Sequence, residues 1–415
     1  MRISDLVPVS QVADIVLGGT PKRSKDAYWG GDIKWASAKD ITSVKTRYIY
    51  NTEETITALG LEESNTKLLP KDTIVITARG TVGAMAMLSE PMTFNQTCYG
   101  LLAKEGVDST HLFYALKADL SKIKSVSYGT VFDTITMKSF DAITIPLPPL
   151  EEQKRIAHIL GTLDDKIELN QRMNATLEEI ARAVFKSWFV DFDPVRAKMA
   201  GEPYPLPDEV MALFPDELVD SELGLIPKGW EVEKVGDIAI NSRDVVHPVE
   251  VDKGTFYIGL EHMPKRCIAL DTWENADKVT SNKYAFRKGS ILFGKLRPYF
   301  HKVGISPVDG ICSTDILIIN GKENIYQNFL LYLLSSKVFV ENVSAASTGT
   351  KMPRTSWKYI ESFEIPIPSQ LILEKFDTIV KPMVDKIVGN IHLYQNLARL
   401  RDVLLLKLMN GEVEV

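Results

Sequence analysis

Five segments of the chain contain glycine and hydroxyl residues, four of them together with basic side chains, a mixture suited to contacts with a polyanion such as a nucleic acid. Arginine can bond a phosphate or a guanine edge through two parallel hydrogen bonds, lysine adds charge, and glycine lets backbone amides approach a phosphate. The segments are 19–25, 78–81 and 128–130 in the first part of the chain, and 294–302 and 348–354 in the second. A single cluster of this kind is more often a solvated surface than a contact.

Two features favour some of these residues over the others. A Gly-Thr pair recurs at Gly129-Thr130 and Gly349-Thr350, and Arg79 and Arg297 each follow a stretch that reads as a strand. The candidate contacts are Lys22, Arg23, Lys25, Arg79, Thr81, Gly129, Thr130, Lys295, Arg297, Tyr299, Lys302, Gly349, Thr350, Lys351 and Arg354.

The sequence contains no motif of a known catalytic centre. There is no Asn-Pro-Pro-aromatic or Asp-Pro-Pro-Tyr motif, no Gly-x-Gly loop of a methyl-donor site and no Gly-Lys-Ser/Thr phosphate loop. The six histidines are scattered without the spacing of metal ligands. We therefore expect no catalytic residue, metal site or cofactor on this chain.

The charge is unevenly distributed. The 415 residues carry a formal charge of −6, which excludes a basic coat over the whole surface. Residues 151–228 have a net charge of −7, whereas 1–150, 229–368 and 369–415 have nets of 0, +1 and 0. The two longer segments can therefore still present basic faces to a polyanion.

The cysteines and the hydropathy of the sequence indicate the cellular compartment of the protein. The three cysteines are an odd number without metal-ligand spacing, which favours a reducing compartment. No apolar run approaches the roughly 20 residues that span a bilayer, and the first residues lack a signal-peptide core. These features predict a cytoplasmic protein without a membrane partner.

The chain repeats itself. At an offset of 220, residues 127–191 align with 347–411 without a gap, and 13 of these 65 positions are identical. A second match, at an offset of 223, pairs 9–15 with 232–238. Matches near both ends of each half predict a tandem duplication, because the repeats of a solenoid are only about 20 to 50 residues long.

Each copy changes character at a proline-rich junction. Upstream of it, short apolar runs such as 72–77 and 289–293 read as strands of a mixed α/β domain. Prolines at 146–149 and 366–368 end the last strand, and a long helix follows. We predict an α+β chain with mixed domains at 1–149 and 229–369, long helices at 150–191 and 370–415, and an irregular, acidic, proline-rich linker at 192–228. The aromatic run 185–192 is expected to pack in a core.

Both helices carry apolar residues at the spacing of a coiled coil. The seam residues of the first helix are Ile156, Leu160, Leu163, Ile167, Asn170, Asn174, Leu177, Ala181 and Val184. Those of the second are Phe376, Val380, Met383, Ile387, Asn390, Leu397 and Leu404. A hydrophobic period of 3.5 residues is the condition for helices to supercoil around each other.

The seams share a central asparagine. Asn170 and Asn390 are equivalent in the repeat, and a buried polar pair fixes the register of a coiled coil. Equivalent residues of two antiparallel helices meet only at the centre, so we expect Asn170 to meet Asn390 on a pseudo-twofold axis. The alternative is that both asparagines are exposed on separate amphipathic helices.

Several short motifs in this order carry a family resemblance. They are the segments 145–156, 163–167, 187–192 and 224–230 and the closing Asn410-Gly411-Glu412. Together they resemble the DNA-specificity (S) subunit of type I restriction-modification systems over nearly the whole chain. The second junction departs from the pattern, since Ser369–Glu374 replaces the Pro-Leu-Glu-Glu-Gln-Lys form.

The resemblance implies a function in sequence recognition. Each mixed domain would be a target recognition domain that reads one half of a split sequence in double-stranded DNA, and the helices would form the spacer. The subunit would bind two modification (methyltransferase) subunits and restriction (endonuclease) subunits, and S-adenosylmethionine, ATP and Mg would be used by those partners. The chain would not be an enzyme by itself.

Two other classes remain open from the sequence. One is a duplicated helical scaffold that recognises no DNA, and the other is a fused nuclease or methyltransferase with an unrecognised site.

A helix of about 40 residues spans roughly 60 Å, compared with about 34 Å for one turn of B-DNA, so the spacer is long enough to separate two half-sites.

Overall fold

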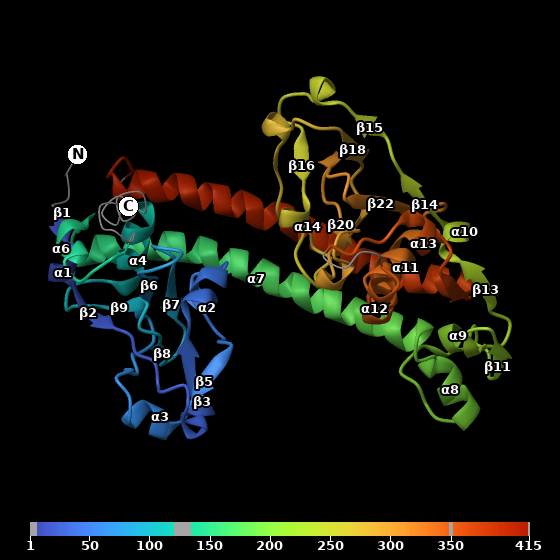
Figure 1. The fold of residues 1–415 in the computed structure, drawn as a ribbon, viewed down its shortest axis with the longest axis horizontal. Helices are drawn as coiled ribbons and strands as arrows, with labels where there is room; N and C mark the ends of the chain where they lie inside the picture. The colour runs from blue at the N-terminus through green and yellow to red at the C-terminus, as the bar shows by residue number, and fades with distance from the viewer. Residues whose placement is uncertain (1–5, 120–133, 348–351, 414–415) are drawn as a thin grey trace. The chain divides into compact units, whose positions relative to one another are not determined.

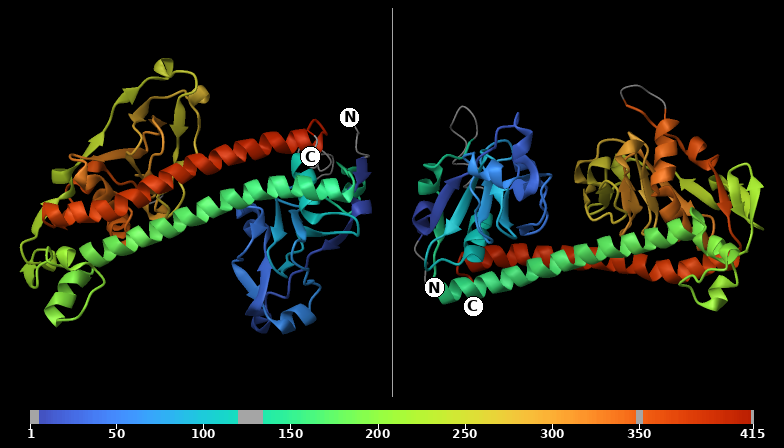
Figure 2. Two further views of the ribbon diagram at one scale, coloured as in Figure 1. Left: turned by 180° about the vertical axis from the view of Figure 1, so that it is seen from behind. Right: turned by 90° about the horizontal axis from the view of Figure 1, so that it is seen from below.

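The computed structural model describes residues 6–119, 134–347 and 352–413 (Figure 1). It forms two compact units, one made of Met1–Leu169 with Tyr394–Val415 and the other of Asn170–Leu393. Two 40-residue helices, α7 (Leu150–Phe189) and α14 (Gln370–Met409), contribute a segment to each unit (Figure 2). The α+β composition and the long helix after each mixed domain, as predicted from the proline junctions, are confirmed.

The described residues of the first unit form three sheets. The largest has the strand order β2 (Ala13–Leu17), β9 (Cys98–Ala103), β6 (Ile74–Thr77), β7 (Met85–Leu88) and β4 (Tyr48–Ile49). The second has the order β5 (Glu54–Ile56), β3 (Trp29–Ala36) and β8 (Thr93–Phe94), and the third pairs β1 (Leu6–Pro8) with β10 (Thr144–Pro146). Ile74 and Ile76 pack in one core while Val75 packs in another, so β6 is buried on both faces. Burial on both faces explains its unbroken apolar sequence.

Short helices complete the first unit. They are α1 (Val9–Val12), the 3₁₀ helix η1 (Asp26–Tyr28), α2 (Ala38–Ser43), α3 (Ala58–Glu62), α4 (Ser109–Ala118) and α6 (Ser139–Ala142). A capping box starts α2, because Ser37 accepts from the Asp40 amide while Asp40 accepts from the Ser37 amide. The α4 helix buries Leu112, Phe113 and Leu116 in the core that contains β6 and β9.

The second unit has four sheets. One has the order β14 (Ala239–Ser242), β22 (Ile316–Gly321), β19 (Ile291–Gly294) and β20 (Val303–Ile305), and another β15 (Val245–Val246), β18 (Lys283–Phe286), β21 (Gly310–Cys312), β16 (Phe256–Ile258) and β17 (Glu274–Asn275). Two pairs remain, β13 (Glu231–Lys234) with β23 (Glu364–Ile367) and β11 (Leu218–Ser221) with β12 (Gly224–Pro227). Its helices are α10 (Val235–Ile238), α11 (Ile325–Leu334), α12 (Lys337–Ala345) and α13 (Trp357–Glu361), and its 3₁₀ turns are η2 (Pro248–Glu250), η3 (Leu260–His262), η4 (Ala276–Lys278) and η5 (Pro298–Phe300).

The two units share one topology, which supports the duplication found in the sequence. The order β2-β9-β6-β7 recurs as β14-β22-β19-β20, and β5-β3-β8 recurs as β17-β16-β21. In both three-stranded groups the central strand is antiparallel to one neighbour and parallel to the other. Even the parallel pairing of β4 with β7 has a counterpart, a bridge between Ala269 and Ile305.

The long helices run antiparallel within each unit. In the second unit Asn174 bonds Asn390, and Phe189 stacks edge-on against Phe376 with ring centroids 4.9 Å apart. In the first unit Asp164 bonds Arg401, while Ile156 and Leu160 share a core with Leu405 and Leu408. Every predicted seam residue is buried or half-buried, as a coiled-coil seam requires.

The register of the asparagines differs from the prediction. Asn390 Nδ2 donates to Asn174 Oδ1 over 2.8 Å, and Asn174 Nδ2 donates to the Ile387 carbonyl over 3.2 Å. The expected pair of Asn170 with Asn390 is therefore wrong by one helical turn, although Asn170 is also buried. The heptad alone could not decide this, because Asn170 and Asn174 both occupy seam positions four residues apart.

The segment 192–228, expected to be irregular, contains ordered elements. They are α8 (Asp193–Ala200), α9 (Asp208–Met211) and the β11–β12 hairpin. Val195, Val210, Phe214 and Ile226 are buried, so these apolar side chains anchor a segment whose prolines and acids suggested a linker. The aromatic run is in the core as predicted, since Phe185, Trp188, Phe189 and Phe192 are buried.

Candidate nucleic-acid interface

A cluster of three loops lies at one end of β6 in the first unit. The first loop is Ala78–Ala84, which joins β6 to β7 and contains Gly80 and Gly83 with φ of 78° and 85°. The Ala78 amide donates to the Thr97 carbonyl over 2.8 Å, which brings in the loop before β9. The Ile135 amide donates to the Ala78 carbonyl over 3.1 Å, which brings in the segment before α6. Arg79 and Thr81 are exposed at the tip of this cluster.

The second unit builds the same cluster at the end of β19. The Lys295 amide donates to the Asp315 carbonyl over 3.0 Å, and the Thr355 amide donates to the Lys295 carbonyl over 3.0 Å. Lys295, Asp315 and Thr355 occupy the places of Ala78, Thr97 and Ile135. In the second unit the predicted segments 294–302 and 348–354 come together, since the Arg297 amide donates to the Pro353 carbonyl over 2.8 Å. In the first unit the described residues place one predicted segment, 78–81, in the cluster, beside Thr97 and Ile135. We call these two sets of loops the first and second loop clusters.

Arg297 is held more tightly than Arg79. Its φ of 51° is left-handed, and its amide donates to the Pro353 carbonyl over 2.8 Å. The Nε of Arg297 is buried with no hydrogen-bond partner among the described residues, and the guanidinium carbon lies 6.0 Å from the centre of the Phe300 ring. By contrast, no described residue pairs with the Arg79 side chain, so its guanidinium is free to take a ligand.

Other predicted residues of the second cluster have varied environments. Tyr299 is half-exposed and its ring lies against Phe300, with centroids 4.8 Å apart. Lys302 Nζ donates to the Leu260 carbonyl over 2.5 Å, and burial, together with the nearby Lys265 ammonium, lowers the pKa of Lys302. Arg354 lies 3.5 Å from the Asp315 carboxylate, which offsets part of its charge.

The predicted residues near the start of the chain are already paired. Arg23 forms a two-point ion pair with Glu54, and its guanidinium carbon lies 3.9 Å above the Trp29 ring. Lys25 Nζ lies 3.2 Å from a Glu63 carboxylate oxygen. Lys22 is exposed. Carboxylates therefore compensate Arg23 and Lys25, and these two residues offer less charge to a phosphate than Arg79 does.

The recurring Gly-Thr loops lie outside the described residues. This applies to Gly129, Thr130, Gly349, Thr350 and Lys351. The structure does place Ile135 and Thr355, which follow these loops in the chain, in the first and second loop clusters.

Sequence reasoning missed polar residues that the fold adds to the clusters. In the first cluster they are Asn95, Gln96 and Thr97; Gln96 is exposed and accepts a hydrogen bond from Thr20. Asparagine and glutamine are the side chains that pair with adenine edges. In the second unit Lys265 is exposed and its Nζ lies 4.4 Å above the Phe300 ring, while the Arg266 amide donates to the His301 carbonyl. The available signal was position, since 95–97 and 313–315 both precede equivalent strands.

One group of three possible metal ligands lies elsewhere among the described residues. Ligand atoms of Glu261, His262 and Glu274 all lie within 4.8 Å of one another. His262 Nδ1 accepts the Gly259 amide over 2.9 Å, so a neutral ring carries its proton on Nε2. In that tautomer neither ring nitrogen has a free lone pair for a cation.

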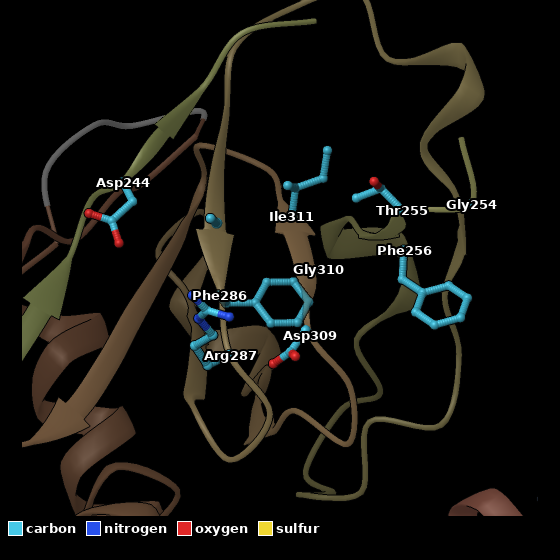
Figure 3. A pocket seen from close by; sticks show the side chains of 10 residues that line it. Asp244, Gly254, Thr255, Phe256, Phe286, Arg287, Asp309, Gly310 and Ile311 are labelled. Atoms are coloured by element: carbon cyan, nitrogen blue, oxygen red, sulfur yellow. The ribbon is translucent and has the colours of Figure 1, made fainter. Parts of the chain in front are cut away.

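A pocket of about 630 Å³ lies in the second unit (Figure 3). Asp244, Phe256, Phe286, Arg287 and Asp309 are among the residues that line it. It lies where β21 begins, at Gly310, whereas the second loop cluster includes the residues that follow the other end of that strand. The pocket is thus separate from the cluster.

Among the residues that the structure describes, no helix has both the length and the apolar sequence that are needed to cross a membrane.

Comparison with known proteins gives the same division into two halves. A sequence model of the type I restriction modification DNA specificity domain matches residues 4–179 and 227–385. The chain belongs to this family. The first match covers one recognition domain and most of α7, and the second covers the other domain and the first 16 residues of α14.

Members of the specificity-domain family are similar to this chain along most of its length. It is 31% identical over 421 residues to the MjaIX specificity subunit of Methanocaldococcus jannaschii, covering 99% of this chain and 94% of that protein. It is 29% identical to the HindI specificity subunit of Haemophilus influenzae, covering 70% and 74%. A crystal structure of a type I S subunit from M. genitalium has a TM-score of 0.58 at 17% identity, covering 99% of this chain and 97% of that one. This structural likeness shows the fold.

Proposed function

We propose that the chain is the DNA-specificity subunit of a type I restriction-modification complex, with each recognition domain reading one half of a bipartite target. The single observation that carries the proposal is the presence of two loop clusters with the same backbone frame and different side chains. Ala78, Thr97 and Ile135 form the frame in one unit, and Lys295, Asp315 and Thr355 form it in the other. Two domains that recognise different half-sites need the same backbone arrangement with different side chains on it.

The clusters combine the two kinds of group that DNA recognition uses. Arg79 and Arg297 supply charge and bidentate donors, which suit phosphate or guanine. Gln96 and Asn95 supply amides, which suit adenine. A mismatched base pair costs only about 1 to 3 kcal/mol, so one small module selects weakly and two modules acting together select strongly.

The chemistry of the complex is assigned to partner subunits. We propose that two modification (methyltransferase) subunits and restriction subunits bind this chain, and that S-adenosylmethionine, ATP and Mg are used by those subunits. This chain supplies recognition and spacing and is not itself a catalyst. The names of its relatives as specificity subunits support this division. The cytoplasm, where cellular DNA is accessible, is the proposed compartment.

Footprinting of the assembled complex tests the proposal. Copies of this chain and its modification subunits are mixed with random-sequence duplexes, and selected duplexes are footprinted at several salt concentrations. The expected result is two protected base-specific segments separated by unread base pairs, with affinity falling as salt rises. Absence of any selected duplex would favour the scaffold alternative. Methylation or cleavage by this chain alone would favour a fused enzyme.

A further inference from the structure

Asp164 joins three elements of the first unit through one buried carboxylate. It lies on α7, and its side chain is only 6% exposed. Its Oδ2 accepts the Tyr114 hydroxyl of α4 over 2.6 Å, and its Oδ1 accepts Arg401 Nη1 of α14 over 2.5 Å. The recognition domain and both helical segments of the unit are thus tied to the same side chain.

A second contact fixes the domain to α7 at the next residue, Asp165. Arg47, directly before β4, is nearly buried and donates from Nη2 to Asp165 Oδ1 over 2.7 Å. A Cβ at Gly161 would lie 2.5 Å from Arg47 Nη1, so this close approach of the guanidinium to α7 requires glycine. Arg401 is held in turn by Asp402, which accepts from its Nε over 2.9 Å and its Nη2 over 2.7 Å.

The second repeat lacks this arrangement. The residue equivalent to Asp164 is Val384, which is buried and apolar, and the residue equivalent to Gly161 is Lys381. Lys381 forms an exposed ion pair with Asp385, the equivalent of Asp165. The second domain is instead bonded to α14 through Asn328, which donates to Asp377 over 2.7 Å, and to α7 through the Ile268 amide, which donates to Glu178 over 3.1 Å. Each domain therefore has its own set of directional bonds to the long helices.

Hydrogen bonds and ion pairs fix the relative orientation of the elements that they join, whereas apolar packing alone does not. Burying charges is unfavourable unless every group is paired, and a buried polar contact is best known for fixing register. One base pair of B-DNA changes a half-site by about 3.4 Å and about 35°, since roughly 10 base pairs make a turn of about 34 Å. A recognition domain that could rotate or shift on its helices by such amounts would accept targets with more than one spacing between the half-sites.

We propose that Asp164 is a positioning residue that holds the first recognition domain at a fixed angle on its helices and so restricts the half-site spacing that the complex accepts. The proposal rests on the proposed function of bipartite recognition. Arg47, Tyr114 and Arg401 are the groups through which Asp164 and its neighbour Asp165 act.

The test uses the complete complex with its modification subunits, once its target has been mapped. Methylation rates are measured on duplexes with the native spacing and with one base pair added or removed. For Asp164→Asn, the preference for native over altered spacing is expected to fall by about tenfold, a change of about 1.4 kcal/mol. Arg401→Gln is expected to act similarly, and Arg401→Lys to retain most of the preference because it keeps the charge.

Asp385→Asn is the matched control, because it makes the same change at an exposed position of α14. Its spacing preference is expected to equal that of the wild type. If Asp164→Asn does not assemble, the two Arg401 variants decide the question. A wild-type spacing preference in Arg401→Gln, or rates that fall in parallel on all spacings, would overturn the proposal. A wild-type complex without any bipartite site would instead refute the proposed function.

Discussion

Arg79 and Arg297 lie within one residue of equivalent positions, because Lys295 matches Ala78 in the shared frame, but their environments differ. Arg79 follows β6 in a loop with two positive-φ glycines and has no described partner, whereas Arg297 is fixed by its own left-handed backbone. A free guanidinium can adapt to its ligand but loses more rotamer entropy on binding. The first half-site should therefore depend on Arg79 through charge, and the second on Arg297 through placement.

Replacing either arginine should weaken DNA binding by the assembled complex. Arg79→Ala and Arg297→Ala are each expected to raise the Kd for the cognate duplex by the equivalent of about 1 to 3 kcal/mol. Titration of a labelled duplex at moderate salt measures this change.

Two controls lie at the opposite ends of the same strands. Lys71 and Arg287 are exposed and precede β6 and β19, so Lys71→Ala and Arg287→Ala remove equal charge away from the loop clusters. Equal losses for the controls and the test variants would show that net charge, and not the clusters, determines binding.

His301 links pH to the stability of the second loop cluster. Burial lowers the pKa of His301 below its ordinary value of 6.5, and its Nε2 lies 2.8 Å from the Ser335 carbonyl. The folded state therefore favours the neutral ring, so this contribution is constant above the unfolded pKa and stability is lost as pH falls below it.

His301→Gln should reduce this pH dependence, because an amide can donate to Ser335 without titrating. Thermal unfolding of the chain at about pH 7.5 and about pH 5.5 measures the effect. The wild type is expected to lose more of its unfolding temperature between these values than the variant. Equal losses would mean that His301 does not titrate in this range.

At the residue level, the sequence indicated which side chains are candidate DNA contacts but not which of them are paired with other side chains. Residue types and spacing were enough to single out Arg79 and the loop that carries Arg297. They could not show that Arg23 is paired with Glu54, or Lys25 with Glu63, because these carboxylates are 31 and 38 residues away. Asn95 and Gln96 were overlooked because neutral amides stand out only after the fold brings their loop beside Ala78.

At the level of elements, helix positions were predictable and helix register was not. The prolines before residue 150 and before residue 370 stop the preceding strands, so both long helices begin where expected. Period alone leaves register open when two asparagines lie one turn apart in the same seam. Side-chain geometry settles it, since Asn390 is bonded to Asn174.

The asparagine pair predicts a measurable coupling between the helices. Asn390→Ala should lower the free energy of unfolding of the full chain by about 1 to 3 kcal/mol, because it leaves the buried Asn174 Oδ1 without its donor. The double variant Asn174→Leu with Asn390→Leu should be close to the wild type in stability, because both polar groups are removed together.

Urea unfolding of Asn174→Leu, Asn390→Leu and the double variant closes the thermodynamic cycle. The expected coupling is at least about 0.5 kcal/mol, as found for residues in contact. Asn170→Ala serves as the comparison, since Asn170 is the residue that repeat symmetry would have paired with Asn390. Additive effects of Asn174 and Asn390 would contradict the observed pair.

At the scale of the whole molecule, the net charge of −6 does not show how unevenly the charge is distributed along the chain. The acidic excess lies in 151–228, so we expect DNA binding to depend on local basic loops and not on the net charge of the chain. The two-domain plan could be predicted because duplication leaves matches that survive divergence. The linker could not, because buried side chains such as Phe214 order a segment whose composition resembles a loop.

The central claim is that this chain gives a complex its bipartite specificity, and mapping methylated adenines tests it most directly. Genomic DNA is exposed to the assembled complex with S-adenosylmethionine, and every modified adenine is located. The account predicts that the modified positions share two short half-sites separated by a constant number of unread base pairs, and that Arg79→Ala relaxes only one of them. A single continuous site, or modification unchanged when this chain is omitted, would contradict it.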